Sequence, residues 1–220
     1  MMRSTTKREI NAKLVFYCGA MGNGKTTHLI SNWFAYTNAN FNTVVFKPSV
    51  DVKGDTKIIA RNGQSIETNY LINLNTNIFE LVKDNFKECD VIIVDESQFL
   101  KKHHIDELVS LVYLENKIVI CYGLLTDYRE ELFEGSKRLI EVGAEIEKIN
   151  IPCECGRDRT HNLRLINDVP VFEGEQIAID GTDAEVTYQS MCGGCFNKRR
   201  FLSLRRGIDS SQLVISGFED

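Results

Sequence analysis

The chain lacks the features that would place it in a membrane or on a polyanion. No stretch of about 18 apolar residues is present, so no spanning helix is expected. Residues 1–8 contain no apolar segment like that of a signal peptide. Acidic residues outnumber basic ones by 31 to 26, whereas dedicated DNA- or RNA-binding proteins usually carry a basic domain. These absences predict a cytoplasmic protein with no membrane and no nucleic acid as partner.

A complete phosphate-binding loop stands near the N-terminus. It fits G-x-x-x-x-G-K-[ST] and consists of Gly19, Ala20, Met21, Gly22, Asn23, Gly24, Lys25 and Thr26. An apolar strand pattern precedes it and helical spacing follows, so that backbone N–H groups and a helix N-terminus point at an anion. Lys25 is expected to reach the outer phosphates of ATP, and Thr26 to hold Mg²⁺. The alternative, a chance glycine-rich turn, does not explain this context.

The first 150 residues alternate strand and helix patterns, which predicts an α/β fold with a mainly parallel sheet and helices on both faces. The expected strands are 13–18, 43–46, 90–95, 117–122 and 146–151, and the expected helices are 27–34, 78–86, 105–114 and a segment around Leu139 and Ile140. Ligands of such sheets bind at the carboxyl ends of the strands. The composition turns polar between residues 48 and 72, and 49–63 is either a surface loop or a β-arm near the nucleotide.

Two acids follow the buried strand pattern at 91–94. Asp95 is placed to act on Mg²⁺, as in other proteins with this loop. Glu96 is placed to take a proton from a nucleophile, which is water in an ATPase and a substrate hydroxyl in a kinase. The alternative for Glu96 is a solvated charge at a strand end.

Seven cysteines are present, and an odd number favours thiols or metal ligands over disulfides. Three are scattered through the first half and are assigned to structure. The others form two pairs, Cys153-x-Cys155 and Cys192-x-x-Cys195. Four thiolates suit tetrahedral Zn²⁺ and leave no open position, which predicts a structural site. An iron–sulfur cluster and free thiols are the alternatives; zinc is favoured because it would staple a small, poorly cored segment.

The pattern changes near Asn150, where helical periodicity disappears and short β-like runs begin. The predicted organisation is an N-terminal arm (1–12), a P-loop nucleotide-binding domain (13–150), a zinc-ribbon-like domain (151–202) and a C-terminal tail (203–220).

From about Leu14 to about Cys195, the chain closely resembles the cellular-type (type II) thymidine kinases. The segments that carry the resemblance, in order, are 19–27, 47–51, 95–99, 122–129, 133–136, 172–176 and the four zinc cysteines. The resemblance implies transfer of the γ-phosphate of ATP to thymidine, and also to deoxyuridine, in nucleotide salvage. It further implies inhibition by dTTP and a homotetramer or homodimer.

The resemblance also implies roles for particular residues. Glu96 would be the base for the thymidine 5′-hydroxyl, and Tyr128 would stack on thymine where the family usually has Phe. Met21 and Leu124 would surround the 5-methyl group. The lasso loop, residues 177–188, would bind the base through its backbone. The implied substrate-binding set is Met21, Phe99, Leu124, Tyr128, Ile177, Ile179, Gly181 and Tyr188, and the ATP set extends to Asp51, Lys53, Asp95 and Gln98.

Several positions depart from the family pattern. Lys53 stands where Arg is frequent in the lid segment, 51–63, and so keeps the charge without the bidentate fork. Ser97 replaces the usual Ala, and Cys195 stands where many bacterial relatives have His. Asn162 falls near a position that packs around the base.

Two other functions compete with a kinase. The first is a zinc-ribbon P-loop ATPase acting on nucleic acid, which the basic residues at 198–200 and 205–206 favour. The acidic total charge and the lack of further helicase-like motifs count against it. The second is a nucleotide-regulated binding protein without turnover, which would have no need of Glu96.

Overall fold

The computed structural model describes residues 10–50, 56–176 and 185–207. Six parallel strands form the main sheet, in the order β5-β2-β6-β7-β1-β8. The strands are β1 (Lys13–Cys18), β2 (Thr43–Pro48), β5 (Tyr70–Ile72), β6 (Val91–Val94), β7 (Ile118–Gly123) and β8 (Glu145–Lys148). The helices beside them are α1 (Lys25–Asn38), α2 (Ile78–Asn85), α3 (Lys102–Glu115) and α4 (Glu134–Glu141).

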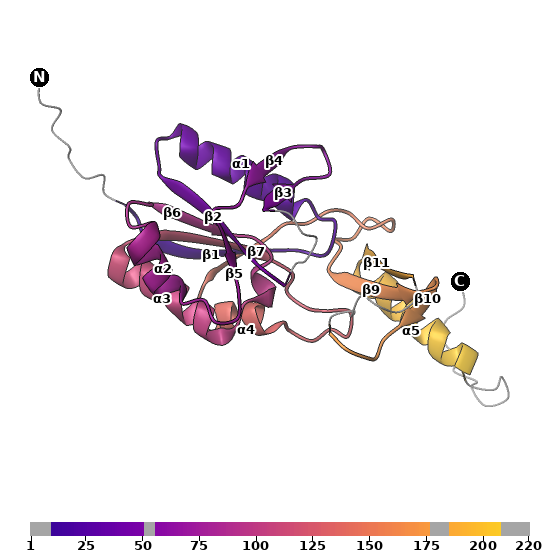
Figure 1. The fold of residues 1–220 in the computed structure, drawn as a ribbon. Coiled ribbons are helices and arrows are strands. Elements are labelled where there is room, and N and C mark those ends of the chain that lie inside the picture. Colours follow the sequence, from indigo (N-terminus) through magenta and orange to yellow (C-terminus); the bar gives the residue numbers. More distant parts are fainter. Residues whose placement is uncertain (1–9, 51–55, 177–184, 208–220) are drawn as a thin grey trace, which may run out of the picture.

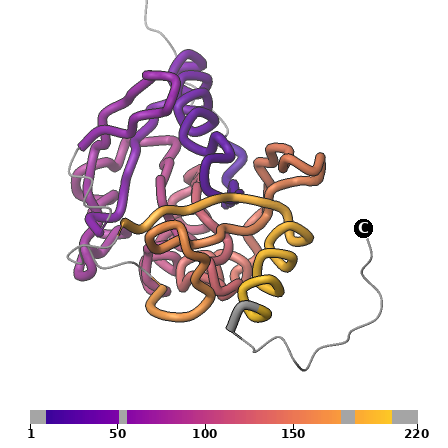
Figure 2. The backbone as a smooth tube through the Cα atoms, turned by 90° about the vertical axis from the view of Figure 1, so that its right-hand side faces the viewer, coloured from indigo at the N-terminus to yellow at the C-terminus, as the bar shows by residue number. Residues whose placement is uncertain are grey.

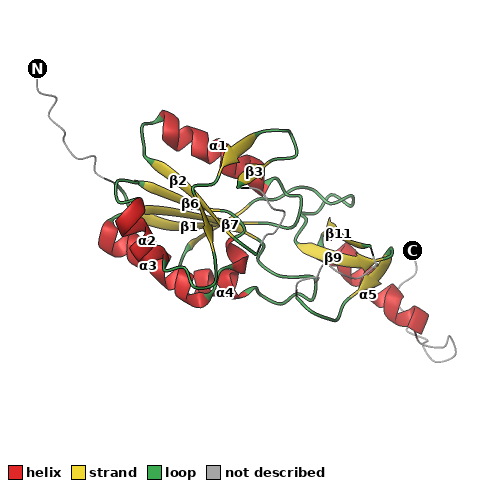
Figure 3. Ribbon diagram, in the orientation of Figure 1, coloured by secondary structure: helices red, strands yellow, loops and turns green. Residues whose placement is uncertain are grey.

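Helices cover both faces of this sheet (Figures 1 and 3). Successive strand residues point to opposite faces, so an unbroken apolar strand supplies two cores. On β6, Ile92 packs in the core under α2, α3 and α4, while Ile93 packs in the core under α1. A hairpin of β3 (Lys57–Ile59) and β4 (Ser65–Glu67) joins α1 on the second face. The predicted α/β class with a parallel sheet is therefore confirmed.

Two strands differ from the sequence-based prediction. The stretch 48–72 contains the hairpin and also an edge strand of the main sheet, β5. The expected strand at 146–151 runs only over Glu145–Lys148. Within the described ranges, no helix combines the length and apolar content that crossing a bilayer would require.

The second part of the chain forms a small antiparallel sheet of β9 (His161–Ile166), β10 (Val169–Val171) and β11 (Val186–Met191), in the order β10-β9-β11. Its core consists of Cys153, Leu163, Met191, Cys192 and Phe196. A core of this size supplies little burial energy, which makes a metal staple physically useful. Figure 2 shows the molecule from the right-hand side of Figure 1. In this view the orange and yellow segments of the second part lie in front of the main sheet, beside the indigo start of α1.

The short β-like runs after residue 152 did not indicate that this part of the chain also contains a helix. Helix α5 (Gly193–Gly207) follows the second cysteine pair and runs across the predicted boundary at 202. Phe196 is the fully buried side chain among those described in α5, while Lys198 and Arg199 are exposed. A helix that buries so narrow a face gives no amphipathic stripe in the sequence. The domain limits themselves remain predictions.

Candidate functional site

The phosphate-binding loop lies between β1 and α1, and its backbone requires glycine. Gly22 and Gly24 have φ of 75° and 78°, in the left-handed region that glycine enters without a steric penalty. Gly24 is also the N-cap of α1. At Gly19 the constraint is space, since a Cβ there would lie 2.5 Å from the Ile149 carbonyl oxygen. The motif glycines thus set the path of the loop, and the segment after β8 supports it.

Lys25 is held over this loop. Its Nζ donates to the carbonyl oxygens of Gly19 and Ala20, both at 3.0 Å. Burial lowers the pKa of the ammonium, and the carboxylates of Glu96 and Asp95 act in the opposite direction. The lysine charge therefore lies within electrostatic reach of both acids: Asp95, predicted for the metal, and Glu96, predicted as the base.

The two acids that follow β6, Asp95 and Glu96, differ in backbone conformation and in hydrogen bonding. Asp95 is 7% exposed, and its N–H donates to the Phe46 carbonyl oxygen on β2 at 3.0 Å. Glu96 has φ 47° and ψ 38°, a left-handed conformation that is uncommon for a residue other than glycine. Such conformations cost about 1–3 kcal/mol and cluster at functional sites. The buried carboxylate of Asp95 and the strained backbone of Glu96 both indicate a functional site at the carboxyl end of β6.

Gln98 holds the Glu96 carboxylate. It belongs to a short 3₁₀ helix, Ser97–Phe99, and its Nε2 donates to Glu96 Oε2 at 2.5 Å. Its Oε1 accepts the Leu124 N–H at 3.1 Å, so one carboxamide links the acid to the segment after β7. A Cβ on Gly123 would lie 2.5 Å from Gln98 Oε1, which explains why glycine ends β7. The predicted ATP contact of Gln98 remains a prediction.

The residues predicted around the nucleoside base are held by contacts within the protein. Tyr128 is 2% exposed, and its hydroxyl donates to the Glu175 carbonyl oxygen at 3.2 Å. Ser136 Oγ donates to the Leu124 carbonyl oxygen at 2.6 Å. Phe99 meets Phe133 edge to face, with 5.8 Å between ring centroids. Because Tyr128 uses its hydroxyl to hold the segment before residue 177, a phenylalanine at this position would lack that contact.

Strand β9 supplies two polar side chains whose contacts sequence reasoning did not foresee. Asn162 is 4% exposed, and its Oδ1 accepts the Met21 N–H at 2.8 Å. Arg164, 5% exposed, contacts both Tyr128 and Tyr188. The available signal was period-two spacing, which puts residues 162 and 164 on the same face of a strand.

A cavity of about 410 Å³ lies between the phosphate-binding loop and the smaller domain. Met21 lines it from the loop and Tyr188 from β11, so two of the predicted nucleoside contacts border the same space. Four cationic side chains also line it: Arg61, Arg159, Lys198 and Arg199. Glu154 also lines the cavity, and the excess of cationic over anionic side chains favours a ligand that carries negative charge.

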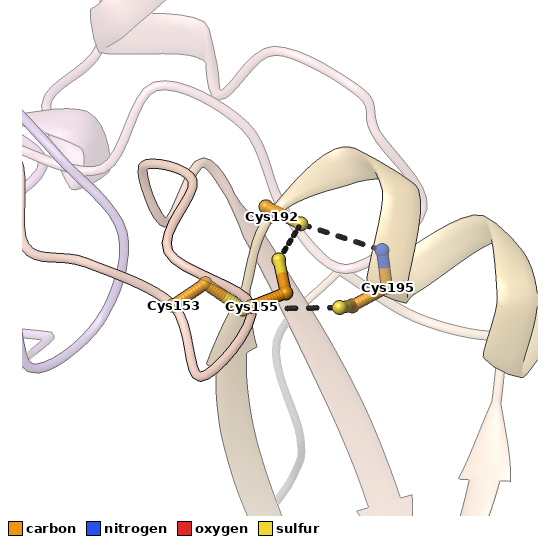
Figure 4. Close-up of side chains that lie close together, drawn as sticks. All are labelled: Cys153, Cys155, Cys192 and Cys195. Carbon is orange, nitrogen blue, oxygen red and sulfur yellow. Dashed lines mark hydrogen bonds between the residues drawn. The ribbon is translucent and has the colours of Figure 1, made fainter.

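The four predicted zinc ligands converge (Figure 4). Their Sγ atoms all lie within 4.8 Å of one another, and the Cys155–Cys192 and Cys153–Cys195 pairs are 3.4 and 3.9 Å apart. Tetrahedral zinc, with Zn–S near 2.3 Å, separates sulfurs by about 3.8 Å. The backbone N–H groups of Cys155 and Cys192 lower the pKa of the Cys153 thiol to about 6, which favours the thiolate that metals bind, whereas hydrogen bonds with the three neighbouring thiols raise the pKa of Cys195. The residues therefore fit a structural zinc ion.

Some predicted site residues lie outside the described part of the chain. These are Asp51 and Lys53 of the lid segment, and Ile177, Ile179 and Gly181 of the lasso. The proposed arm up to residue 9 and the tail beyond residue 207 lie outside it as well.

Comparison with known proteins identifies a family. The family model described as "Thymidine kinase" matches residues 12–196. A thymidine kinase of Mannheimia succiniciproducens is 37% identical over 193 residues, covering 86% of this chain and 96% of the relative. The Coxiella burnetii thymidine kinase is 38% identical over 177 residues, which cover 78% of this chain and 90% of the relative. Among solved structures, AMPPCP-bound DnaA from Aquifex aeolicus has a TM-score of 0.40 at 16% identity, covering 63% of this chain and 40% of that one. A likeness that distant supports no conclusion.

Proposed function

The chain belongs to the thymidine kinase family, and on that premise we propose that it transfers the γ-phosphoryl group of ATP to the 5′-hydroxyl of thymidine, giving dTMP. The observation that carries the proposal is the placement of Glu96. Its carboxylate is held by Gln98 and lies within electrostatic reach of Lys25. The same kind of phosphate site occurs in ATP hydrolases and in kinases. A positioned base such as Glu96 can accept a proton from a substrate hydroxyl, as a kinase requires, as well as from water.

Each residue then has a defined task. Phosphoryl transfer depends on alignment and on charge neutralisation more than on covalent help. Lys25 would bind the outer phosphates, and Glu96 would orient the 5′-hydroxyl and accept its proton. Thr26 and Asp95 would hold Mg²⁺, which supplies positive charge beside the phosphate oxygens.

The nucleoside would bind between the phosphate-binding loop and the smaller domain. Tyr128 would provide a face for thymine, and Met21 with Leu124 would surround its 5-methyl group. Exclusion of water around the transferred group would limit hydrolysis of ATP. The zinc ion would be structural, because four cysteines leave it no open coordination position.

Several finer properties belong to the same proposal. We propose that deoxyuridine is also phosphorylated, that dTTP inhibits the enzyme, and that the chain works in the cytoplasm as a homotetramer or homodimer. Inhibition assays with dTTP test the second proposal, and light scattering of the purified protein tests the oligomeric state.

One assay tests the central proposal against its rival. ATP-dependent conversion of labelled thymidine to the monophosphate is measured with and without single-stranded DNA. We expect dTMP formation that needs Mg²⁺ and is unaffected by DNA. The cationic side chains around the cavity are the observation that favours a nucleic-acid ATPase. DNA-stimulated ATP hydrolysis without dTMP would establish that rival and reject the kinase.

A further inference from the structure

Arg164 occupies the centre of the small sheet. It lies on β9, the middle strand, where its cross-strand neighbours are Val171 on β10 and Tyr188 on β11. Only 5% of its surface is exposed. Burying an arginine is costly unless its donors are satisfied. The contacts of Arg164 must therefore account for its position.

The guanidinium donates in three directions. Its Nε donates to the Tyr188 hydroxyl at 2.9 Å, and its two terminal nitrogens donate to the carbonyl oxygens of Glu175 at 2.8 Å and Gln176 at 3.1 Å. Its central carbon lies 3.8 Å from the centroid of the Tyr128 ring and 5.4 Å from that of Tyr188. A planar cation thus contacts the faces of both tyrosines while its fork binds backbone oxygens.

These contacts join three segments that are distant in the sequence. Tyr128 comes from the segment after β7, Glu175 and Gln176 come from the segment before residue 177, and Tyr188 comes from β11. Neighbouring bonds strengthen the same junction: Arg129 donates to the Gly174 carbonyl oxygen at 2.9 Å. Arg164 contacts all three segments.

We infer that Arg164 is a positioning residue for the nucleoside: it fixes the rings of Tyr128 and Tyr188, two predicted nucleoside contacts, relative to each other. The inference rests on the proposed function, because it takes both tyrosines as nucleoside contacts. Arg164 acts through these residues and is not itself a catalytic group. Lysine cannot replace it, because an ammonium has neither the plane that stacks on a ring nor the fork that binds two carbonyls.

The test is steady-state kinetics of Arg164→Lys with thymidine and with ATP. We expect the KM for thymidine to rise about tenfold, while kcat and the KM for ATP stay within about threefold of wild type. A merely structural role predicts a different result, since a smaller folded fraction lowers kcat and leaves KM unchanged. Arg205→Lys, on the exposed part of α5, is the matched control and should behave as wild type.

A double-mutant cycle separates action through Tyr188 from a direct contact. Tyr188→Phe removes the hydroxyl that Arg164 binds and keeps the ring, so its thymidine KM should rise about threefold. The double variant should be no worse than Arg164→Lys alone, because both changes break one interaction. If Arg164→Lys does not fold, the thymidine KM of Tyr188→Phe alone tests the inference.

Unchanged thymidine KM in both single variants, or additive effects in the double variant, would overturn the inference. If the wild-type protein forms no dTMP at all, it is the proposed function that fails, and the inference fails with it.

Discussion

The side-chain oxygen of Asn162 accepts the backbone N–H of Met21 at 2.8 Å and thereby joins the smaller domain, which carries the four clustered cysteines, to the phosphate-binding loop. A second side chain strengthens this junction from the loop. Asn23 donates its Nδ2 to the carbonyl oxygens of Ile149 at 2.9 Å and Arg159 at 3.3 Å. The shape of the phosphate-binding loop therefore depends on a domain that begins more than a hundred residues later in the chain.

Asn162→Ala should weaken this junction. The change leaves the Met21 N–H without its acceptor, which costs about 1 kcal/mol of unfolding free energy and lowers Tm by about 2–4 °C. The KM for both ATP and thymidine should rise, because the loop is predicted to border both sites. Calorimetry and kinetics measure these effects. Asn75→Ala, at an exposed position, is the control, and equal behaviour of the two variants would contradict the prediction.

Glu96→Gln should lower kcat by about 10² or more, since the amide cannot accept a proton. The amide oxygen can still accept from Gln98 Nε2, so thymidine binding should be preserved. Steady-state kinetics and a binding titration separate the two effects. Glu88→Gln, an exposed change, should leave turnover intact. Near-normal turnover of the Glu96 variant would remove Glu96 from the mechanism.

Gly123→Ala should displace the Gln98 carboxamide. The new Cβ would lie 2.5 Å from Gln98 Oε1 and 3.1 Å from the Gln98 backbone nitrogen. Because Glu96 then loses its donor, we expect kcat to fall about tenfold. Gln98→Ala should have a similar effect, and combining the two should add little. Additive losses would show that Gly123 acts by another route.

Zinc removal should unfold the smaller domain. Structural zinc contributes about 10–16 kcal/mol in zinc-finger peptides, which is comparable to the whole burial energy of the five side chains in this small core, about 1.5–3 kcal/mol each. We expect one zinc ion per chain by metal analysis, loss of circular-dichroism signal and of dTMP formation with chelator, and recovery with added Zn²⁺. Cys192→Ser should reproduce the loss, and Glu154→Ala, between the first two cysteines, should not. A folded, active protein without metal would contradict a structural site.

The affinity for ATP should depend on the charge of Lys25. Burial places the folded pKa of this lysine below its unfolded value of 10.5, so the folded protein binds fewer protons between the two values and its free energy of unfolding rises with pH there. Bound phosphates favour the charged form, so ATP binding takes up a proton, and the Kd for ATP should increase as pH rises through the lowered pKa. Titrations of wild type and Lys25→Arg across this range test the point. The arginine variant stays charged and should lack this dependence.

Much of the fold could be predicted because its signals are local. The strand patterns at 13–18 and 117–122 reappear as β1 and β7, which pair in parallel, because buried parallel strands form unbroken apolar runs. Helix α5 could not be predicted, since it buries little beyond Phe196 and its described charged side chains are exposed. Strand β5 could not be predicted either, because it has only three residues and lies at the edge of the sheet, where one side of the strand has no neighbouring strand.

The sequence by itself determined the chemical groups. The phosphate-binding loop, the acids after β6 and the two cysteine pairs are each short contiguous motifs, and local backbone geometry is enough to define them. Only the tertiary structure decided which side chains position these groups. The contacts of Asn162 with Met21, and of Arg164 with Tyr128 and Tyr188, depend on the register of β9 and on the packing of one domain against the other. Residues so far apart in the chain meet only when the whole fold brings them together, and no local pattern records that they will.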